Sequence, residues 1–224
     1  MRAPISVIIP TLEAGAALPF CLAALVEGLE AGLIREVIVS DGGSGDASCA
    51  VARAWGAEVV TGAASRGGQL RRGCAAAAGD WLLVLHADTV LAPGWSRVAA
   101  AHLGRGEAGW FRLAFDDGGL PGRLVAGWAN LRSRAGLPYG DQGLLLPRAL
   151  YEAVGGYPDQ PLMEDVALAR ALRGRLRGLG AVAVTSAEKY RAQGWLRRGA
   201  RNLWTLARYA AGASPEALAR RYRG

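Results

Sequence analysis

Residues 5–13 read Ile-Ser-Val-Ile-Ile-Pro-Thr-Leu-Glu, a short apolar run that ends abruptly in polar residues. A run of this kind, rich in β-branched side chains, is typical of a strand buried on both faces of a parallel sheet. The pattern recurs at residues 36–40, 58–61 and 81–85, with helix-like stretches between the runs. Because strand and helix alternate at this spacing, we expect right-handed crossovers and a mostly parallel central sheet flanked by helices. The sequence therefore predicts an α/β protein.

The second half of the chain is less regular. Residues 109–115 alternate like an exposed edge strand or an antiparallel strand, and residues 143–146 resemble a short apolar strand. Helical periodicity marks residues 120–134, 163–173 and 195–211.

No repeat, linker or break in composition divides the chain, and a further helix is expected to start at Ser214-Pro215-Glu216. We therefore predict a single domain of 224 residues, which is long enough for one substantial core. Residues 1–190 are expected to carry binding and catalysis, and residues 191–224 to form a basic helical extension of the same domain.

The charge balance bears on the partners of the protein. The formal net charge is +7, and Lys189 is the only lysine among the 26 basic residues. This arginine bias reflects either codon usage or an anionic partner such as a nucleoside diphosphate, a phosphorylated acceptor or a membrane surface. No nucleic-acid-binding module is recognisable, so we expect no nucleic-acid partner.

The cysteines and the N-terminus bear on the compartment. Cys21, Cys49 and Cys74 show neither zinc-ligand spacing nor a CxxC pair, and each lies in an apolar context that favours a small buried side chain. The apolar run at residues 5–9 is closed by Pro10, unlike the longer core of a signal peptide. We expect a cytoplasmic protein, with the inner face of the membrane as the alternative.

Polar residues follow each of the four predicted parallel strands. They occur at residues 10–13, 41–46, 65–69 and 86–89. Because ligands of open parallel sheets bind outside the carboxyl ends of the strands, these four clusters are expected to meet at one edge of the sheet. A single polar loop has little meaning, but four in register favour a binding site.

Three residues in these clusters suggest a phosphate site. Asp88 follows a rigid apolar strand, where its carboxylate is suited to a divalent cation; a helix cap is the structural alternative. His86 is either a metal ligand or a buried structural histidine. Arg66 lies between glycines at a helix start and is suited to clamp a diphosphate.

Two clusters in the second half are further candidates. Glu164 and Asp165 begin a predicted helix, where they either stabilise the helix dipole or supply a general base. Residues 139–142, Tyr-Gly-Asp-Gln, form a compact polar turn that is suited to bind a sugar or an acceptor.

Four motifs together resemble the family 2 glycosyltransferases of the GT-A fold, the group that includes dolichol-phosphate mannose synthase. In the family's order they are Ile5-Ser-Val-Ile-Ile-Pro-Thr11, Glu36-Val-Ile-Val-Ser-Asp-Gly-Gly-Ser-Gly-Asp46, Gly79-Asp-Trp-Leu-Leu-Val-Leu-His-Ala-Asp88 and Met163-Glu-Asp-Val-Ala-Leu168. The similarity is greatest to a bacterial subgroup in which the metal motif reads His-Ala-Asp-Thr and a Pro-Tyr-Gly-Asp-Gln turn follows.

The resemblance implies a single GT-A domain that uses Mn²⁺ or Mg²⁺ and a UDP- or GDP-sugar. It implies that Asp165, with Glu164 beside it, is the base of a single inverting displacement, and that Asp88 and His86 lie at the metal. The residues expected to bind the nucleotide sugar are Pro10, Thr11, Glu13, Asp41, Gly42, Arg66, Gln69, Ala87 and Asp88. Those expected to bind the acceptor or sugar are Tyr139, Gly140, Asp141 and Gln142. The acceptor itself, lipid-linked or not, is left undefined.

The chain departs from the family pattern at two positions and leaves alternative functions open. His86 replaces the first acid of the family's Asp-x-Asp motif, and Gly42 replaces a second aspartate. A non-catalytic nucleotide-binding protein or a nucleotidyltransferase on the same sheet therefore remains an alternative. A nucleotidyltransferase is less favoured because residues 10–13 lack a glycine-rich loop, and no G-x-G-x-x-G follows the first strand as a dehydrogenase would require.

The C-terminal helix predicted at residues 195–211 has two interpretations. Leu196, Leu203, Ala207 and Ala210 form an apolar stripe, and arginines occupy another face. The helix either rests on an anionic membrane or packs its apolar stripe on the domain and leaves the arginines in water.

Overall fold

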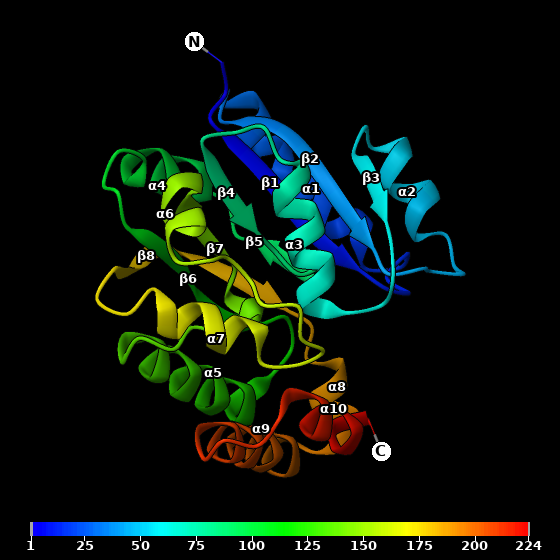
Figure 1. Ribbon diagram of the computed structural model, residues 1–224, viewed down its shortest axis with the longest axis vertical. Helices are drawn as coiled ribbons and strands as arrows, with labels where there is room; N and C mark the ends of the chain where they lie inside the picture. The colour runs from blue at the N-terminus through cyan, green and yellow to red at the C-terminus, as the bar shows by residue number, and fades with distance from the viewer. Residues whose placement is uncertain (1, 224) are drawn as a thin grey trace.

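One eight-stranded mixed sheet organises the fold, in the order β3-β2-β1-β4-β7-β6-β8-β5 (Figure 1). The computed structural model describes residues 2–223. The strands are β1 Ile5–Thr11, β2 Ile34–Asp41, β3 Glu58–Thr61, β4 Trp81–Val84, β5 Thr89–Leu91, β6 Ala108–Phe115, β7 Leu144–Pro147 and β8 Leu176–Thr185. Strands β1 to β4 pair in parallel, which confirms the mostly parallel α/β sheet that the first half of the sequence predicts.

Helices cover both faces of this sheet (Figure 1). Their bounds are α1 Leu18–Glu30, α2 Ser48–Ala54, α3 Arg66–Ala76, α4 Trp95–His102, α5 Gly119–Arg134, α6 Arg148–Ala153, α7 Glu164–Ala171, α8 Glu188–Gln193, α9 Trp195–Ala210 and α10 Pro215–Arg223. A short 3₁₀ turn, η1 Gly140–Gln142, precedes β7.

The second half of the sheet differs from its sequence-based prediction. Strand β6 lies inside the sheet, antiparallel to β7 and parallel to β8. Its interpretation as an exposed edge strand is therefore wrong, whereas the alternative of an antiparallel strand holds for its pairing with β7. The sequence analysis also missed β8, although it is the longest strand. Residues 176–180 include two glycines and the exposed Arg177, so the apolar alternation is visible only in the second half of that strand.

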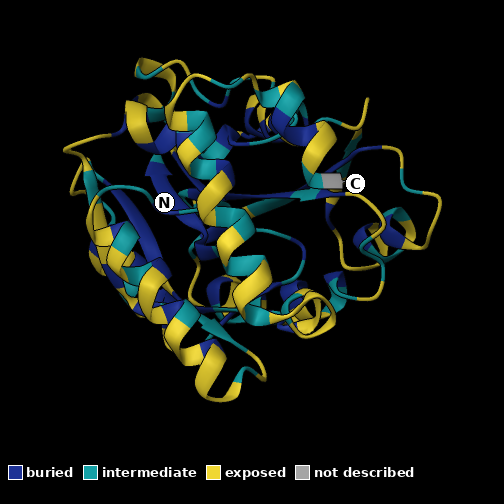
Figure 2. Ribbon diagram, turned by 90° about the horizontal axis from the view of Figure 1, so that it is seen from below, coloured by how far each residue is buried: buried dark blue, intermediate teal, exposed yellow. Residues whose placement is uncertain are grey.

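Two hydrophobic clusters hold the layers together. Because successive residues of a strand point to opposite faces, Val7 and Ile9 pack with α1, α2 and α4, whereas Ile8 packs with α3, α6 and α7. Trp95 and Phe111 are the largest fully buried side chains, and both belong to the first cluster. Figure 2 shows this buried layer inside a shell of exposed helix faces.

The C-terminal helices α8, α9 and α10 lie together beside α5 (Figure 1). In helix α9, Thr205 is buried and Leu206 and Tyr209 are half-buried, whereas Leu196, Leu203, Ala207 and Ala210 are exposed. The expectation that the apolar stripe packs on the domain is therefore wrong, since that stripe faces outward. No helix within residues 2–223 combines the length and apolarity needed to cross a bilayer.

Gly28 permits the contact between α1 and α4, and its replacement tests that packing. A Cβ atom at Gly28 would lie 2.5 Å from the ring of the buried Trp95, whereas one at Gly127 in α5 would meet open space. We expect Gly28→Ala to lower the free energy of unfolding by about 1–3 kcal/mol because of overpacking. Gly127→Ala should raise it by up to about 1 kcal/mol through helix propensity. Urea unfolding of both variants measures the difference, and equal stabilities would contradict the packing described.

Candidate active site

Two adjoining cavities lie at the carboxyl ends of the parallel strands. The β1-side cavity, of about 550 Å³, is bounded by the loops after β1 and β4 and by the start of α3. The α7-side cavity, of about 140 Å³, is bounded by η1, α7 and the C-terminal helices. Arg66, His86 and Asp88 line both cavities, so the two form one continuous site.

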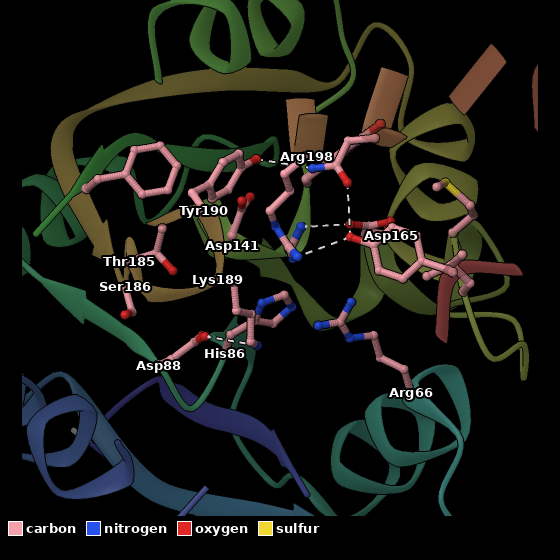
Figure 3. Close-up of a pocket in the computed structure, with 17 residues that line it drawn as sticks. Arg66, His86, Asp88, Asp141, Asp165, Thr185, Ser186, Lys189, Tyr190 and Arg198 are labelled. Atoms are coloured by element: carbon pink, nitrogen blue, oxygen red, sulfur yellow. Dashed lines mark hydrogen bonds and ion pairs between the residues drawn. The ribbon is translucent and has the colours of Figure 1, made fainter. Parts of the chain in front are cut away.

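Figure 3 shows the α7-side cavity with Asp88, His86 and Arg66 along one side and Asp141 and Asp165 across from them. The residues of the first group follow β4 or begin α3, and those of the second come from η1 and α7. The site therefore joins the parallel half of the sheet to the half with antiparallel pairings.

Asp88 lies in the loop between β4 and β5, with a side chain that is 33% exposed. The loop is fixed at both ends, because the backbone of Leu85 donates to Ile8 and that of Thr89 donates to His86. Lys189 of α8 places its Nζ 3.8 Å from an Asp88 carboxylate oxygen. A pair this long and exposed contributes little to stability, so Asp88 is available to a ligand.

Arg66 is held at the site by a buried acid. Its Nε lies 3.5 Å from Oε1 of Glu164, and the Arg66 side chain is 45% exposed whereas that of Glu164 is 2% exposed. Burial and the neighbouring Asp165 raise the pKa of Glu164, and Arg66 opposes that shift. Gly67 permits this approach, since a Cβ there would lie 2.1 Å from the carbonyl oxygen of Pro158.

Asp165 is oriented by two backbone donors. Its Oδ2 accepts a hydrogen bond of 2.9 Å from the amide of Gly140, and its Oδ1 accepts one of 2.7 Å from that of Val166. Met163, just before the helix, has a φ of +66°, which turns the chain so that α7 begins at the cavity. The Asp165 carboxylate lines the α7-side cavity from a fixed position.

The η1 turn brings a partly unsatisfied polar group to the same cavity. The guanidinium of Arg132 lies 3.3 Å from the centre of the Tyr139 ring. One carboxylate oxygen of Asp141 is buried without a hydrogen-bond partner. Desolvation raises the pKa of Asp141 to about 6, with Arg132 opposing and Asp165 adding to the shift. An unpaired buried carboxylate is unfavourable for stability and is typical of a site that receives a ligand.

His86 is neutral and tightly packed at the junction of the cavities. Desolvation and the charge of Arg66 lower its pKa to about 4. A Cβ at Gly140 would lie 2.4 Å from Nε2 of His86, so only glycine permits η1 to approach the imidazole this closely. His86 therefore presents an uncharged ring at neutral pH.

The C-terminal helices supply a wall that the sequence analysis did not predict. Tyr190, Arg198, Asn202 and Tyr222 line the α7-side cavity. The amide of Asn202 donates to the Tyr190 hydroxyl at 3.1 Å and accepts from that of Tyr222 at 3.0 Å. Arg198 adds a hydrogen bond of 3.4 Å to Tyr222. Only periodicity marks these residues in the sequence, and it does not indicate which face meets a cavity.

The predicted site residues fall into two groups. Those that line a cavity are Pro10, Glu13, Arg66, Gln69, His86, Ala87, Asp88, Tyr139, Gly140, Asp141 and Asp165. Those that line neither cavity are Thr11, Asp41, Gly42, Gln142 and Glu164.

Hydrogen bonds within the protein account for Asp41 and Gln142 in the second group, and Glu164 is taken up by its ion pair with Arg66. The Asp41 carboxylate accepts from the amides of Gly43 and Ser44, and these bonds outweigh burial so that the pKa of Asp41 is lowered. Gln142 is fully buried, bonds Ser133 through Oε1 and donates to Phe111 through Nε2. Polar side chains after a strand are thus used both to order loops and to line the site.

The family of the chain follows from a comparison with known families. Residues 6–138 match the model of glycosyl transferase family 2, which is more than half of the chain. The protein belongs to glycosyl transferase family 2 and has a GT-A-like fold. A search of curated proteins finds no match.

Solved structures share this fold at low sequence identity. A structure of S. aureus TarS residues 1–349 in complex with UDP has a TM-score of 0.63 and 17% identity, over 84% of this chain and 62% of that one. A structure of glucosyl-3-phosphoglycerate synthase from Mycobacterium tuberculosis with Mn²⁺ and UDP-glucose has a TM-score of 0.57 and 23% identity, over 82% of this chain and 69% of that one. The chain thus spans less than two thirds of the TarS fragment.

The raised pKa of Asp141 predicts a pH-dependent effect on stability. The folded protein holds this proton more tightly than the unfolded chain, so the stabilisation is complete below about pH 4 and is lost as the pH rises through about 6. Asp141→Asn removes the charge, and its stability relative to wild type should therefore increase between pH 4 and 7, by at most about 3 kcal/mol. Urea unfolding across this range measures the change. A difference that is constant with pH would contradict the assignment.

Proposed function

We propose that the protein transfers a sugar from a nucleoside-diphosphate sugar to an acceptor hydroxyl, with inversion at the anomeric carbon. The observation that carries this proposal is the shared cavity, in which Asp88 and Arg66 face the oriented carboxylate of Asp165. A direct displacement requires groups that bind the diphosphate, for which Asp88 and Arg66 are suited, and a group that accepts a proton, for which Asp165 is suited.

The β1-side cavity is the proposed donor site. Pro10, Glu13 and Gln69 line it, and Arg66 and Asp88 lie where it meets the second cavity. A nucleotide held there would direct its diphosphate toward the guanidinium of Arg66, which forms strong bidentate contacts with phosphate oxygens. UDP and UDP-glucose in the two related structures support a UDP-sugar as donor, with a GDP-sugar as the alternative.

The residues present fit a divalent cation that arrives with the nucleotide. Within residues 2–223 no group of three or more His, Cys, Asp or Glu side chains is placed to hold an ion. Asp88 would hold Mn²⁺ or Mg²⁺ with His86 close by, and phosphate oxygens and water would complete the shell, as these ions prefer. When bound, such an ion stabilises negative charge on the departing diphosphate.

Asp165 is the proposed general base. It takes the proton of the acceptor hydroxyl while that oxygen forms a bond to the anomeric carbon and the bond to the diphosphate oxygen breaks. The nucleoside diphosphate leaves as an anion, for which Arg66 supplies positive charge. The backbone bond from Gly140 holds Asp165 in place for this transfer. Glu164 acts through Arg66 as a positioning residue, because it does not line the cavity.

The α7-side cavity is the proposed acceptor site. Tyr139, Gly140 and Asp141 line it beside Arg198 of α9, so residues from both predicted parts of the chain contribute. Among the family 2 enzymes that resemble dolichol-phosphate mannose synthase, we group the chain with the bacterial subgroup whose metal motif reads His-Ala-Asp-Thr.

Nucleotide binding is tested by thermal unfolding with UDP or GDP, in the presence of Mn²⁺ or of EDTA. A ligand that binds only the native state raises the melting temperature. At ligand concentrations well above Kd, the rise is on the order of a few degrees. We expect a shift with one diphosphate plus metal and a much smaller shift for Asp88→Ala. Asp80→Ala, at the opposite end of β4, is the matched control and should respond like wild type. No shift with any nucleotide would favour a non-catalytic protein.

The assignment of the base is tested with Asp165→Asn. The variant keeps the shape of the side chain but loses the proton acceptor, so we expect turnover to fall about 10²- to 10⁴-fold. The UDP-induced thermal shift should remain, since Asp165 does not line the β1-side cavity. Turnover, as sugar-nucleotide hydrolysis or as transfer, is measured by the amount of nucleoside diphosphate released. Asp80→Asn is the control variant. Full turnover in Asp165→Asn would exclude this base.

A further inference from the structure

Helix α5 carries an apolar stripe that faces outward. Leu120, Leu124, Trp128 and Leu131 recur at helical spacing and are 69%, 67%, 55% and 56% exposed. The opposite face of the helix is buried, since Ala126 and Ala129 pack inward and Asn130 bonds the backbone of β6. The exposed apolar stripe is therefore separate from the buried face that holds α5 on the domain.

Helix α9 carries a second outward stripe. Leu196, Leu203 and Trp204 are 88%, 51% and 64% exposed. The inward side of α9 supplies Arg198 and Asn202 to the wall of the α7-side cavity, and it packs Leu206 and Tyr209 against the cluster of Met163, Val166 and Leu218. An amphipathic helix of a globular protein normally buries its apolar side, so this orientation needs another explanation.

The two stripes form one surface. Helices α5 and α9 pack together, and Trp128 and Leu203 both line a narrow cavity between them. Tyr139 and Asp141 line the inner end of that cavity and also the α7-side cavity. We call the outward side of these helices the α5–α9 face, defined by the seven side chains of the two stripes. Figure 2, viewed from below, shows exposed faces on the helices toward the viewer.

The charged side chains of α5 and α9 themselves have one sign. Arg123 and Arg134 flank the stripe of α5, and Arg197 and Arg208 flank that of α9. Neither helix contains an aspartate or glutamate in its sequence. Exposed leucine and tryptophan bordered by arginine is the composition of helices that lie in the interface of an anionic bilayer.

The same charges disfavour a second copy of the chain as the occupant. A two-fold dimer places the same patch against itself, which would bring these arginines together without any acid from either helix. Like charges at an interface are unfavourable, whereas anionic headgroups attract basic residues near the membrane surface.

We infer that the α5–α9 face docks on an anionic lipid bilayer, with both helices parallel to its surface. The tryptophans and leucines enter the headgroup region and the flanking arginines meet lipid phosphates. Docking brings the cavity between α5 and α9 to the membrane, so the α7-side cavity opens beside the lipid. The inference goes beyond the proposed transfer reaction and does not depend on it, since vesicle binding and nucleotide binding are measured separately.

Flotation with vesicles tests the docking. Vesicles of phosphatidylcholine alone are compared with vesicles that contain phosphatidylglycerol as about one third of the lipid, at low salt and at roughly 0.5 M salt. We expect binding to the anionic vesicles only, weakened by salt, with a blue shift of tryptophan fluorescence. Leu131→Glu and Leu196→Glu should each weaken binding at least about tenfold, because each places a charge in the apolar contact.

The matched control is Leu29→Glu on α1, where the leucine is 51% exposed but lies outside the α5–α9 face. It should bind anionic vesicles like wild type. Circular dichroism and thermal unfolding establish that each variant is folded. The inference is overturned if wild type does not bind anionic vesicles, or if Leu131→Glu and Leu196→Glu bind as wild type does. It is also overturned if light scattering finds a dimer that these two variants dissociate, because the face would then be an interface between copies.

Discussion

The contact on which the site depends is the ion pair between Arg66 and Glu164. Arg66 begins α3, which belongs to the parallel half of the sheet, and Glu164 begins α7, which follows the antiparallel strand β7. A buried carboxylate without a cation is strongly unfavourable, so the pairing holds the two helix starts together. The neighbour of Glu164 in sequence is Asp165, so this contact brings Asp165 to the cavity, where the amides of Gly140 and Val166 orient its carboxylate. Gly67 makes the contact possible by allowing α3 to approach the loop at Pro158.

Around this contact the protein places several acidic and basic side chains close together in one cavity. Asp88, Asp141 and Asp165 share a cavity with Arg66 and Arg198, and desolvation raises the pKa of Asp141 while it keeps His86 neutral. A cavity of this composition suits an anionic leaving group on one side and a proton acceptor on the other. The backbone supplies the remaining order, because the amide of Gly140 fixes Asp165 and its lack of a side chain admits His86.

The C-terminal helices connect this chemistry to the surface. Helix α9 meets the α7-side cavity through Arg198 and Asn202, and Leu206 and Tyr209 pack beside them on the domain. The stripe of Leu196, Leu203 and Trp204 is left exposed to the surroundings. The arrangement explains why the same segment contributes Arg198 and Asn202 to a cavity and Leu196 and Trp204 to the proposed bilayer contact.

The sequence by itself determined the parallel half of the sheet and the edge at which Arg66, His86 and Asp88 meet, because short apolar runs and the polar loops that follow them are local signals. It did not determine the position of β6, the existence of β8 or the face that α9 presents, since each depends on partners distant in the chain. Asp41 and Gln142 illustrate the same limit within the predicted site, because a polar residue after a strand has the same sequence signal whether it bonds its own loop or lines a cavity. Tertiary packing decided between these uses, because only the fold determines which polar groups find partners within the protein and which remain open to a ligand.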